Sequence, residues 1–170
     1  MKLSRHFARA SHWTFTIKPI KALLGEYVGF GKGWIDPYAG KNSPAEITND
    51  INQDMPSDYH MDAREFCKML SGNYVGVLFD PPYSYRQVKE HYEAAGVKPD
   101  QYDTSYNFYS RVMNAISPKI QPGGLAISFG WNSNGFGKKR GFEIIEIMLV
   151  AHGLHHNDTI VTVERKSLSD

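Results

Sequence analysis

Residues 76–83 read Gly-Val-Leu-Phe-Asp-Pro-Pro-Tyr, an apolar run that ends abruptly in Asp80-Pro81-Pro82-Tyr83. The apolar residues predict a buried strand, and the strand must end at Pro81 because proline has no backbone N–H to donate to a sheet. Open α/β sheets bind ligands at this end of a strand. Asp80 and the Pro81 carbonyl can accept hydrogen bonds from an –NH2 group, and Tyr83 offers a face for stacking. We therefore expect a pocket for an amino-bearing heterocycle such as adenine or cytosine; a capped Pro-rich turn is the alternative.

Strand and helix patterns alternate on both sides of this stretch. The predicted strands before it are 34–36, 45–51 and 59–61, and the predicted helices there are 18–27 and 63–70. After it, we predict helices at 84–95, 104–117 and 142–152 and strands at 125–129 and 159–164. The alternation predicts an α/β fold, a Rossmann-like, doubly wound and mostly parallel sheet. The 170 residues suit a single domain without a separate target-recognition domain. The polar and basic residues 1–14 are a candidate for a flexible segment, and anchoring by Phe7 and Trp13 is the alternative.

Composition excludes several classes of protein. Hydrophobic residues make up 41% and charged residues 22%, as in globular proteins, and no apolar run is long enough to span a membrane. The first residues lack the apolar core of a secretory signal. The lone Cys67 excludes an intrachain disulfide, fits a reducing cytosol, and has neighbours that suggest packing. A net charge of +1 decides nothing about nucleic acid, although residues 2–12 and 138–140 are locally basic.

Polar residues follow the predicted strands in order. Asp36, Asp50, Asp62 and Asp80 come at or after four successive strands, and this order favours chemistry over four unrelated turns. The three histidines near the C-terminus lack a supporting Cys or carboxylate pattern, which argues against a zinc site. The glycine-rich residues 29–33 precede a strand, so they do not form a phosphate-binding loop.

The ordered motifs resemble those of the amino-group DNA methyltransferases, which use S-adenosylmethionine to methylate adenine or cytosine at an exocyclic nitrogen. The resemblance runs from Phe15 to Glu164 and is greatest to small stand-alone adenine methylases of bacteriophages. The catalytic motif with Asp in first place resembles the adenine type. The resemblance implies that Asp80, Pro81, Pro82 and Tyr83 are catalytic. It also implies S-adenosyl-L-methionine as cofactor, DNA with a flipped adenine as partner, no metal, a role such as restriction–modification, and a cytoplasmic location, in the host cell if a phage encodes the protein.

The same resemblance assigns cofactor-binding residues. Asp36-Pro37-Tyr38-Ala39-Gly40-Lys41-Asn42 stands where the family has Asp-Pro-Phe-x-Gly-x-Gly, which implicates Asp36, Tyr38 and Gly40. Asp50 matches the acidic residue on the ribose hydroxyls. Asp62 matches the residue that binds the adenine amino group, and it is also a candidate N-cap for the helix that follows. Phe15 and Thr16 match the motif at the methionine end, with simple core packing as the alternative.

One departure from the family affects the cofactor loop. Only residues 38–44 separate the loop from the next predicted strand, which is too few for a crossover of about a dozen residues. The first crossover helix is therefore expected to be shortened or missing. Cofactor binding is the function that this departure affects most.

Two segments are candidates for substrate binding. Tyr85 and Arg86 follow the catalytic motif and could stack on bases and contact phosphates, or simply cover the sheet. The glycine-rich residues after 129 lead to Lys138-Lys139-Arg140, which we expect to form a mobile loop over the site that grips phosphate. A solvated loop is the alternative.

Other functions stay open from the sequence. They are methylation of cytosine, RNA or a protein amide, and non-catalytic binding of nucleic acid or protein by a chain that has lost its cofactor.

Overall fold

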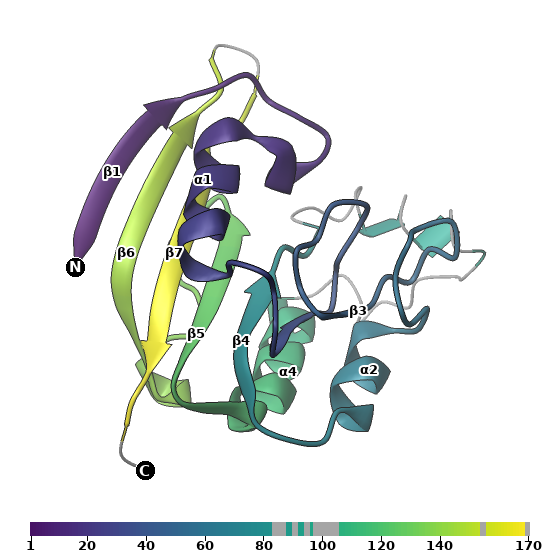
Figure 1. Ribbon diagram of the computed structural model, residues 1–170. Coiled ribbons are helices and arrows are strands. Elements are labelled where there is room, and N and C mark those ends of the chain that lie inside the picture. The colour runs from purple at the N-terminus through teal and green to yellow at the C-terminus, as the bar shows by residue number, and fades with distance from the viewer. Residues whose placement is uncertain (83–87, 90–91, 94–95, 97–105, 154–155, 169–170) are drawn as a thin grey trace.

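The computed structural model describes residues 1–82, 88–89, 92–93, 96, 106–153 and 156–168 (Figure 1). In these residues the strands form one seven-stranded sheet. The strands are β1 (Lys2–Phe7), β2 (Trp34–Asp36), β3 (Ile47–Thr48), β4 (Tyr74–Phe79), β5 (Ile120–Gly130), β6 (Phe142–Ala151) and β7 (Thr159–Lys166). The helices are α1 (Lys18–Tyr27), α2 (Ala63–Met69) and α4 (Tyr106–Ile116), with short 3-10 turns η1 (Thr14–Thr16), η2 (Ser117–Lys119) and η3 (Lys138–Arg140).

The sheet is mostly parallel, as predicted. Its order is β1-β6-β7-β5-β4-β2-β3, and only β7 runs antiparallel to its two neighbours. The chain leaves β2 for β3 on one side and later returns to place β4 on the other side. The strand order therefore reverses between β2 and β4, and ligands of open α/β sheets bind at the carboxyl ends of the strands beside such a reversal.

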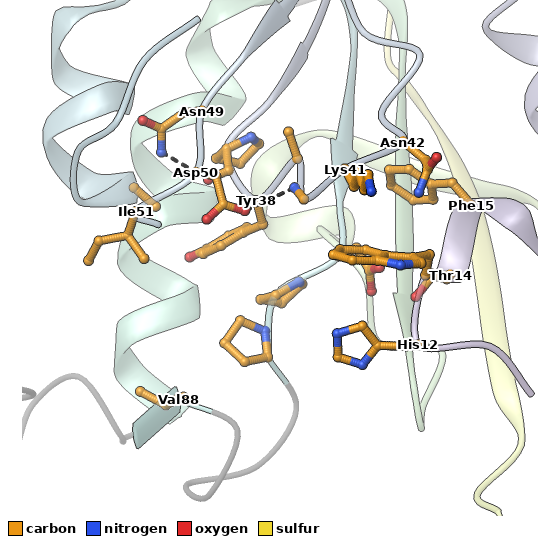
Figure 2. Close-up of a pocket in the computed structure, with 18 of the residues that line it drawn as sticks. His12, Thr14, Phe15, Tyr38, Lys41, Asn42, Asn49, Asp50, Ile51 and Val88 are labelled. Atoms are coloured by element: carbon orange, nitrogen blue, oxygen red, sulfur yellow. Dashed lines mark hydrogen bonds between the residues drawn. The ribbon is translucent and has the colours of Figure 1, made fainter. Parts of the chain in front are cut away.

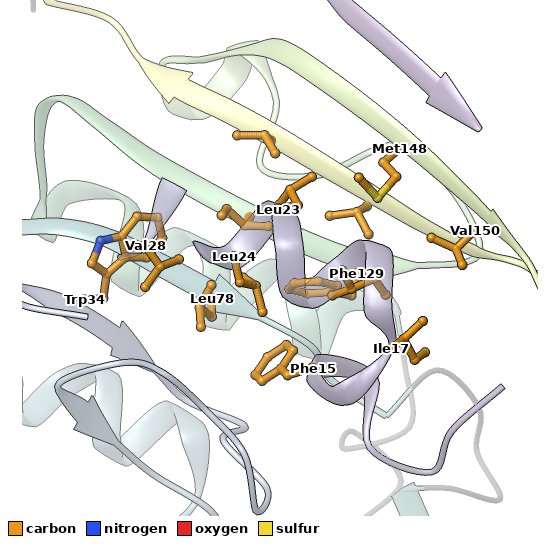
Figure 3. Packing of buried hydrophobic residues seen from close by; sticks show 14 residues of the cluster. Phe15, Ile17, Leu23, Leu24, Val28, Trp34, Leu78, Phe129, Met148 and Val150 are labelled. Carbon is orange, nitrogen blue, oxygen red and sulfur yellow. The ribbon is translucent and has the colours of Figure 1, made fainter. Parts of the chain in front are cut away.

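Helices cover both faces of the sheet, so the fold is doubly wound. The helix α1 begins with Pro19 in its first turn and buries Ile20, Leu23 and Leu24, which lie on one side of a helix. These residues pack against β5 and β6 through Phe129, Met148 and Val150 (Figure 3).

On the opposite face, α2 and α4 pack over β4 and β2. Cys67 of α2 is fully buried there, as its sequence context suggested, and burial raises the pKa of its thiol to about 12.

The first crossover helix is missing, as the sequence predicted. Residues 37–46 connect β2 to β3 and contain only turns and irregular backbone. The next predicted strand, 59–61, is reduced to a single parallel bridge between Asn49 and Tyr59.

One predicted helix is wrong: residues 142–152 form strand β6 instead. Their apolar residues fit both a helix and a strand over such a short length. The strand prevails because Ile144, Ile145, Ile147 and Val150 are β-branched and the segment pairs on both sides, with β1 and β7. The strand β1 was not predicted, since it forms by pairing with β6.

Candidate active site

A cavity of about 290 Å³ opens at the strand reversal (Figure 2). Its walls come from segments far apart in sequence: residues 12–15 before α1, residues 37–42 after β2, residues 49–51 after β3 and residues 80–82 after β4. Several residues that the sequence analysis assigned to the site line this cavity: Phe15, Tyr38, Gly40, Asp50, Asp80, Pro81 and Pro82.

Asp36 ends β2 and is fully buried. Its Oδ1 accepts the Tyr38 backbone N–H at 2.9 Å, and its Oδ2 accepts the Ser43 hydroxyl at 2.6 Å. Burial raises the pKa of Asp36 to about 7; the two hydrogen bonds oppose this rise, and the neighbouring charges of Asp80 and Asp50 add to it. The carboxyl holds the loop after β2 in its turn.

Asp80 directly follows β4 and lines the same cavity. Burial raises its pKa to about 7, and a hydrogen bond from the Thr14 side chain partly offsets this. Pro81 is buried beside it, and the Pro82 carbonyl accepts the Tyr109 hydroxyl from α4. The helix thus helps to fix the path of the chain after Asp80. Tyr83, Tyr85 and Arg86 lie outside the described residues.

Asp50 holds the cofactor loop in this structure. Its Oδ2 accepts the Gly40 backbone N–H at 2.9 Å, and its Oδ1 accepts the Asn52 N–H at 2.9 Å. Gly40 has a φ of +55°, which favours glycine. Each carboxylate oxygen can accept a second hydrogen bond, so this role leaves capacity for a ligand hydroxyl.

Asn49 is a site residue to which the sequence assigned no role. Its Nδ2 donates to the Pro37 carbonyl at 3.1 Å and the Met61 carbonyl at 3.0 Å, while its Oδ1 accepts the Met61 N–H at 3.1 Å. The side chain is almost fully buried. It therefore ties three strand-end loops together, a role that only the folded arrangement reveals.

Tyr38 presents a polar group that has no partner among the residues that the structure describes. Its ring packs edge-on against Phe79 with centroids 5.4 Å apart, and the side chain lines the cavity (Figure 2). The hydroxyl is buried and meets no hydrogen-bonding group among the described residues. Burial raises the pKa of this hydroxyl well above its ordinary value, so it stays protonated. A buried O–H in a cavity wall calls for a partner from a ligand or water.

Phe15 and Thr16 occupy different places. Phe15 is buried and contributes to the cavity wall, and its ring packs against that of Phe129 with the two centroids 5.1 Å apart. Thr16 is exposed, does not line the cavity, and donates its hydroxyl to the Trp13 carbonyl at 2.7 Å.

His12 and Trp13 line the cavity although the sequence did not single them out as site residues. Their rings meet edge-on with centroids 4.8 Å apart. The Trp13 ring also lies against Gly40, where a Cβ would come within 3.3 Å of it. This contact joins segments 27 residues apart, and no local pattern in the sequence signals it.

Asp62 caps α2, as predicted. Its Oδ1 accepts the Arg64 N–H at 2.8 Å and Nε at 2.9 Å, and its Oδ2 accepts the Tyr92 hydroxyl at 3.0 Å. Burial alone would raise the pKa of Asp62, but the hydrogen bonds from Arg64 and Tyr92 outweigh it and hold the pKa below its ordinary value. The neighbours Met61 and Ala63 line the cavity, while Asp62 itself lies behind the wall.

Lys138, Lys139 and Arg140 are not near the cavity, which corrects their expected placement. Phe142, the first residue of β6, pairs with Lys166 at the end of β7, while Gly130, at the carboxyl end of β5, pairs with Ile160 near the start of β7. The three basic residues precede β6 and therefore lie at the opposite edge of the sheet, which follows from β6 being a strand.

Hydrogen bonds hold the loop that leads to Lys138, Lys139 and Arg140. Buried Glu164 accepts the backbone N–H groups of Phe136 at 2.6 Å and Gly137 at 2.8 Å, and burial raises its pKa. Arg140 donates to the Asn114 side chain at 2.7 Å and the Ser110 hydroxyl at 2.8 Å on α4.

No helix in the described part of the chain has the length and apolar character needed to cross a bilayer. Among the same residues, no three His, Cys, Asp or Glu side chains converge as metal ligands would.

No protein-family model matches the chain, and the comparison with curated proteins finds no relative. Solved structures do match. The yhhF protein of Escherichia coli, a candidate methyltransferase, aligns with a TM-score of 0.59 and 8% identity over 96% of this chain and 92% of its own. The 1,6-didemethyltoxoflavin-N1-methyltransferase of Burkholderia thailandensis, solved with S-adenosylhomocysteine, aligns with a TM-score of 0.58 and 12% identity over 88% and 77%. The magnesium protoporphyrin IX methyltransferase of Synechocystis PCC 6803, solved with S-adenosylmethionine, aligns with a TM-score of 0.52 and 12% identity over 88% and 79%.

These likenesses concern the fold. The chain has the Rossmann-like α/β fold of S-adenosylmethionine-dependent methyltransferases. The matched proteins carry names with different substrates, so the fold leaves the substrate open.

Proposed function

We propose that this protein transfers a methyl group from S-adenosylmethionine to the exocyclic amino group of adenine in DNA. One observation carries the proposal: the loop after β2 and the Asp80-Pro81-Pro82 turn after β4 line the same cavity at the strand reversal. The loop after β2 suits a cofactor, and the Asp80-Pro81-Pro82 turn suits an amino group. The order of the motifs along the chain, which resembles that of the adenine methylases, supports the choice of substrate.

The residues present fit the cofactor. The cavity volume of about 290 Å³ is near the lower end of small-molecule pockets, ~300–1,000 Å³. The Tyr38 hydroxyl, which has no partner among the described residues, and the spare acceptor capacity of Asp50 offer polar contacts, and Gly40 lines the cavity. Structures with this fold were solved with S-adenosylmethionine or its demethylated product. When bound, the cofactor supplies an electrophilic methyl group on a sulfonium sulfur.

Asp80 and the Pro81 carbonyl would act on the amino group. An exocyclic amino nitrogen is a weak nucleophile because its lone pair is delocalised into the ring. Hydrogen bonds from this –NH2 to the Asp80 carboxylate and the Pro81 carbonyl would localise the pair on nitrogen and stabilise the positive charge that develops there. The raised pKa of Asp80, about 7, suits it to take up the proton that the nitrogen releases after methylation. An adenine must leave the DNA helix to reach this pocket, and Tyr83 would stack on it.

The test is incubation with S-adenosylmethionine and unmethylated DNA, followed by mass spectrometry of the nucleosides. We expect N6-methyladenine. Exclusive formation of N4-methylcytosine, methylation of RNA or protein in place of DNA, or the absence of any product with no cofactor binding in calorimetry would each contradict the proposal.

Asp80→Ala provides the matched test of mechanism. Turnover should fall by about 100-fold or more, because a group that stabilises charge in the transition state is lost, while calorimetry should show cofactor affinity changed by less than about 3-fold. Asp54→Ala is the control, since it removes an exposed carboxylate outside the cavity and should leave turnover intact. Near-normal turnover in Asp80→Ala would rule out this mechanism.

A further inference from the structure

We propose that the basic arm, defined as residues 5–12, binds the phosphate backbone of a nucleic acid beside the cavity, together with Lys41. This inference rests on the proposed function for its substrate class and names the residues that hold the substrate. It replaces Lys138, Lys139 and Arg140 as the phosphate contact, because those residues lie at the other edge of the sheet.

The basic arm follows the edge of the sheet where the cavity opens. Phe7 ends β1 and pairs with Ala151 at the end of β6, which runs parallel to β5 and β4. The Ala8 N–H donates to the Ala151 carbonyl at 3.1 Å. The arm then continues to His12 in the cavity wall (Figure 2). It therefore leads from the outer strand into the candidate active site.

His152 anchors the arm at its turn. Its Nδ1 lies 2.9 Å from the Ala8 carbonyl oxygen and its Nε2 lies 2.9 Å from the Thr159 hydroxyl, so one ring joins the ends of β1, β6 and β7. The His152 backbone N–H donates to Asp158 at 3.2 Å. Because the two ring nitrogens of His152 contact Ala8 and Thr159, the basic arm has a defined course along this edge of the sheet.

The charge of the arm suits a polyanion. Residues 1–25 contain no Asp or Glu. Arg5, Arg9 and His12 are exposed, and the Arg5 guanidinium lies 4.9 Å from the centroid of the Phe7 ring. Lys41 is exposed on the wall that the loop after β2 contributes.

Neither Arg9 nor Lys41 forms an ion pair with any residue that the structure describes. Cations that are not neutralised within the protein bind phosphates by releasing condensed counterions. Arg9 and His12 are three residues apart, so their Cα atoms lie within about 11 Å of each other, and one short oligonucleotide can contact both.

The experiment compares two charge reversals, Arg9→Glu and Lys139→Glu. Both replace an exposed cation by Glu, but only Arg9 lies at the edge of the sheet where the cavity opens, just after the end of β1. Binding of fluorescein-labelled oligonucleotides of about 12 nucleotides is followed by anisotropy from about 50 to about 200 mM salt. The three probes are single-stranded DNA, the DNA duplex and single-stranded RNA, and the tightest of them identifies the source of the phosphates.

We expect Arg9→Glu to weaken binding about 10-fold at low salt and to reduce the slope of log affinity against log salt by ~0.7 for a single strand or ~0.9 for a duplex. Lys139→Glu should bind as the native protein does. Arg9→Gln, with half the change in charge, should weaken binding by a smaller factor. Equal losses in Arg9→Glu and Lys139→Glu, an unchanged Arg9→Glu, or no binding of any probe by the native protein would overturn the inference.

Cofactor titration separates this inference from the proposed function. Arg9→Glu should bind S-adenosylmethionine with native affinity, because Arg9 does not line the cavity. If the native protein binds oligonucleotides through Arg9 but neither binds the cofactor nor forms methylated bases, the proposed function fails and the inference stands.

Discussion

Asp36 and Asp80 are the residues whose protonation has the largest consequences. Both are carboxyl groups at the ends of neighbouring strands, and burial raises the pKa of each to about 7. The charge of Asp80 adds to the rise at Asp36. The protonation of these carboxyls therefore changes near neutral pH, whereas the proposed reaction needs the Asp80 carboxylate. Turnover should rise as the pH passes through about 7.

Stability should depend on pH in the opposite sense. A carboxyl with a raised pKa binds more protons in the folded state than in the unfolded state between the two pKa values. The stability that this proton uptake contributes is complete below about pH 4 and is lost as the pH rises through about 7.

Asp36→Asn tests this dependence. The side-chain amide keeps an oxygen for the Tyr38 N–H and can donate to the Ser43 hydroxyl, so the loop contacts survive. Between pH 5 and 7 the unfolding free energy of the native protein should fall as the pH rises. In Asp36→Asn this fall should be smaller by about 1 kcal/mol per pH unit, as urea denaturation can measure. Asp54→Asn, at an exposed site, should leave the slope as in the native protein. An unchanged slope in Asp36→Asn would show that Asp36 does not titrate as described.

Side-chain hydrogen bonds replace the missing helix between β2 and β3. Asp36, Asn49 and Asp50 together accept or donate the bonds that shape residues 37–43. The connection also packs on Gly31, where a Cβ would lie 1.8 Å from the Pro44 carbonyl oxygen. A short crossover therefore keeps its shape through contacts at both ends.

Gly31→Ala should displace this connection. Both Gly31 (φ +79°) and Gly29 (φ +58°) have left-handed backbone, but nothing lies within 4 Å of a Cβ at Gly29. Gly29→Ala should cost only the backbone strain, about 1–2 kcal/mol. Gly31→Ala should cost a further 1–3 kcal/mol, roughly the penalty of overpacking. It should also weaken cofactor binding, as calorimetry can measure. Equal losses of unfolding free energy in the two variants would contradict the tight contact at Pro44.

For the molecule as a whole, the sequence predicted the fold class and most of the sheet. Pro81 marks the end of β4, and Asp62 marks the start of α2, because proline and N-cap residues have local effects. The strand β6 was missed because ten apolar-rich residues fit two periodicities, and pairing with β1 and β7 decides between them.

Because residues 142–152 were predicted as a helix, the basic residues 138–140 were predicted at the wrong edge of the sheet. A helix after β5 would have left them at the cavity, whereas a strand parallel to β5 must start at the opposite edge. The contact of Trp13 with Gly40 and the bonds of Asn49 could not be predicted either, because they depend on the three-dimensional meeting of separate loops.

The buried Glu146 links the N-terminus to the rest of the sheet. Its Oε1 lies 3.1 Å from the Lys2 amine, and its Oε2 accepts the Tyr27 hydroxyl at 2.7 Å. Lys2→Ala should lower the urea midpoint, because a buried carboxylate loses its counter-charge. The double variant Lys2→Ala/Glu146→Gln should recover part of the loss. Lys21→Ala, at an exposed position on α1, is the control. A midpoint that Lys2→Ala leaves unchanged would show that the ion pair does not stabilise the fold.

The position of β1 has a further consequence for self-association. It is the outermost strand, so the backbone groups on its outer side are open to pairing, and Leu3 and Phe7 are exposed beside them. Such an edge invites addition of strands from other copies, and cations along it deter this by mutual repulsion. Arg5 supplies that repulsion here, since Lys2 is paired with Glu146. Salt screens it, so raising the ionic strength or neutralising Arg5 should favour edge-to-edge aggregation of the native fold.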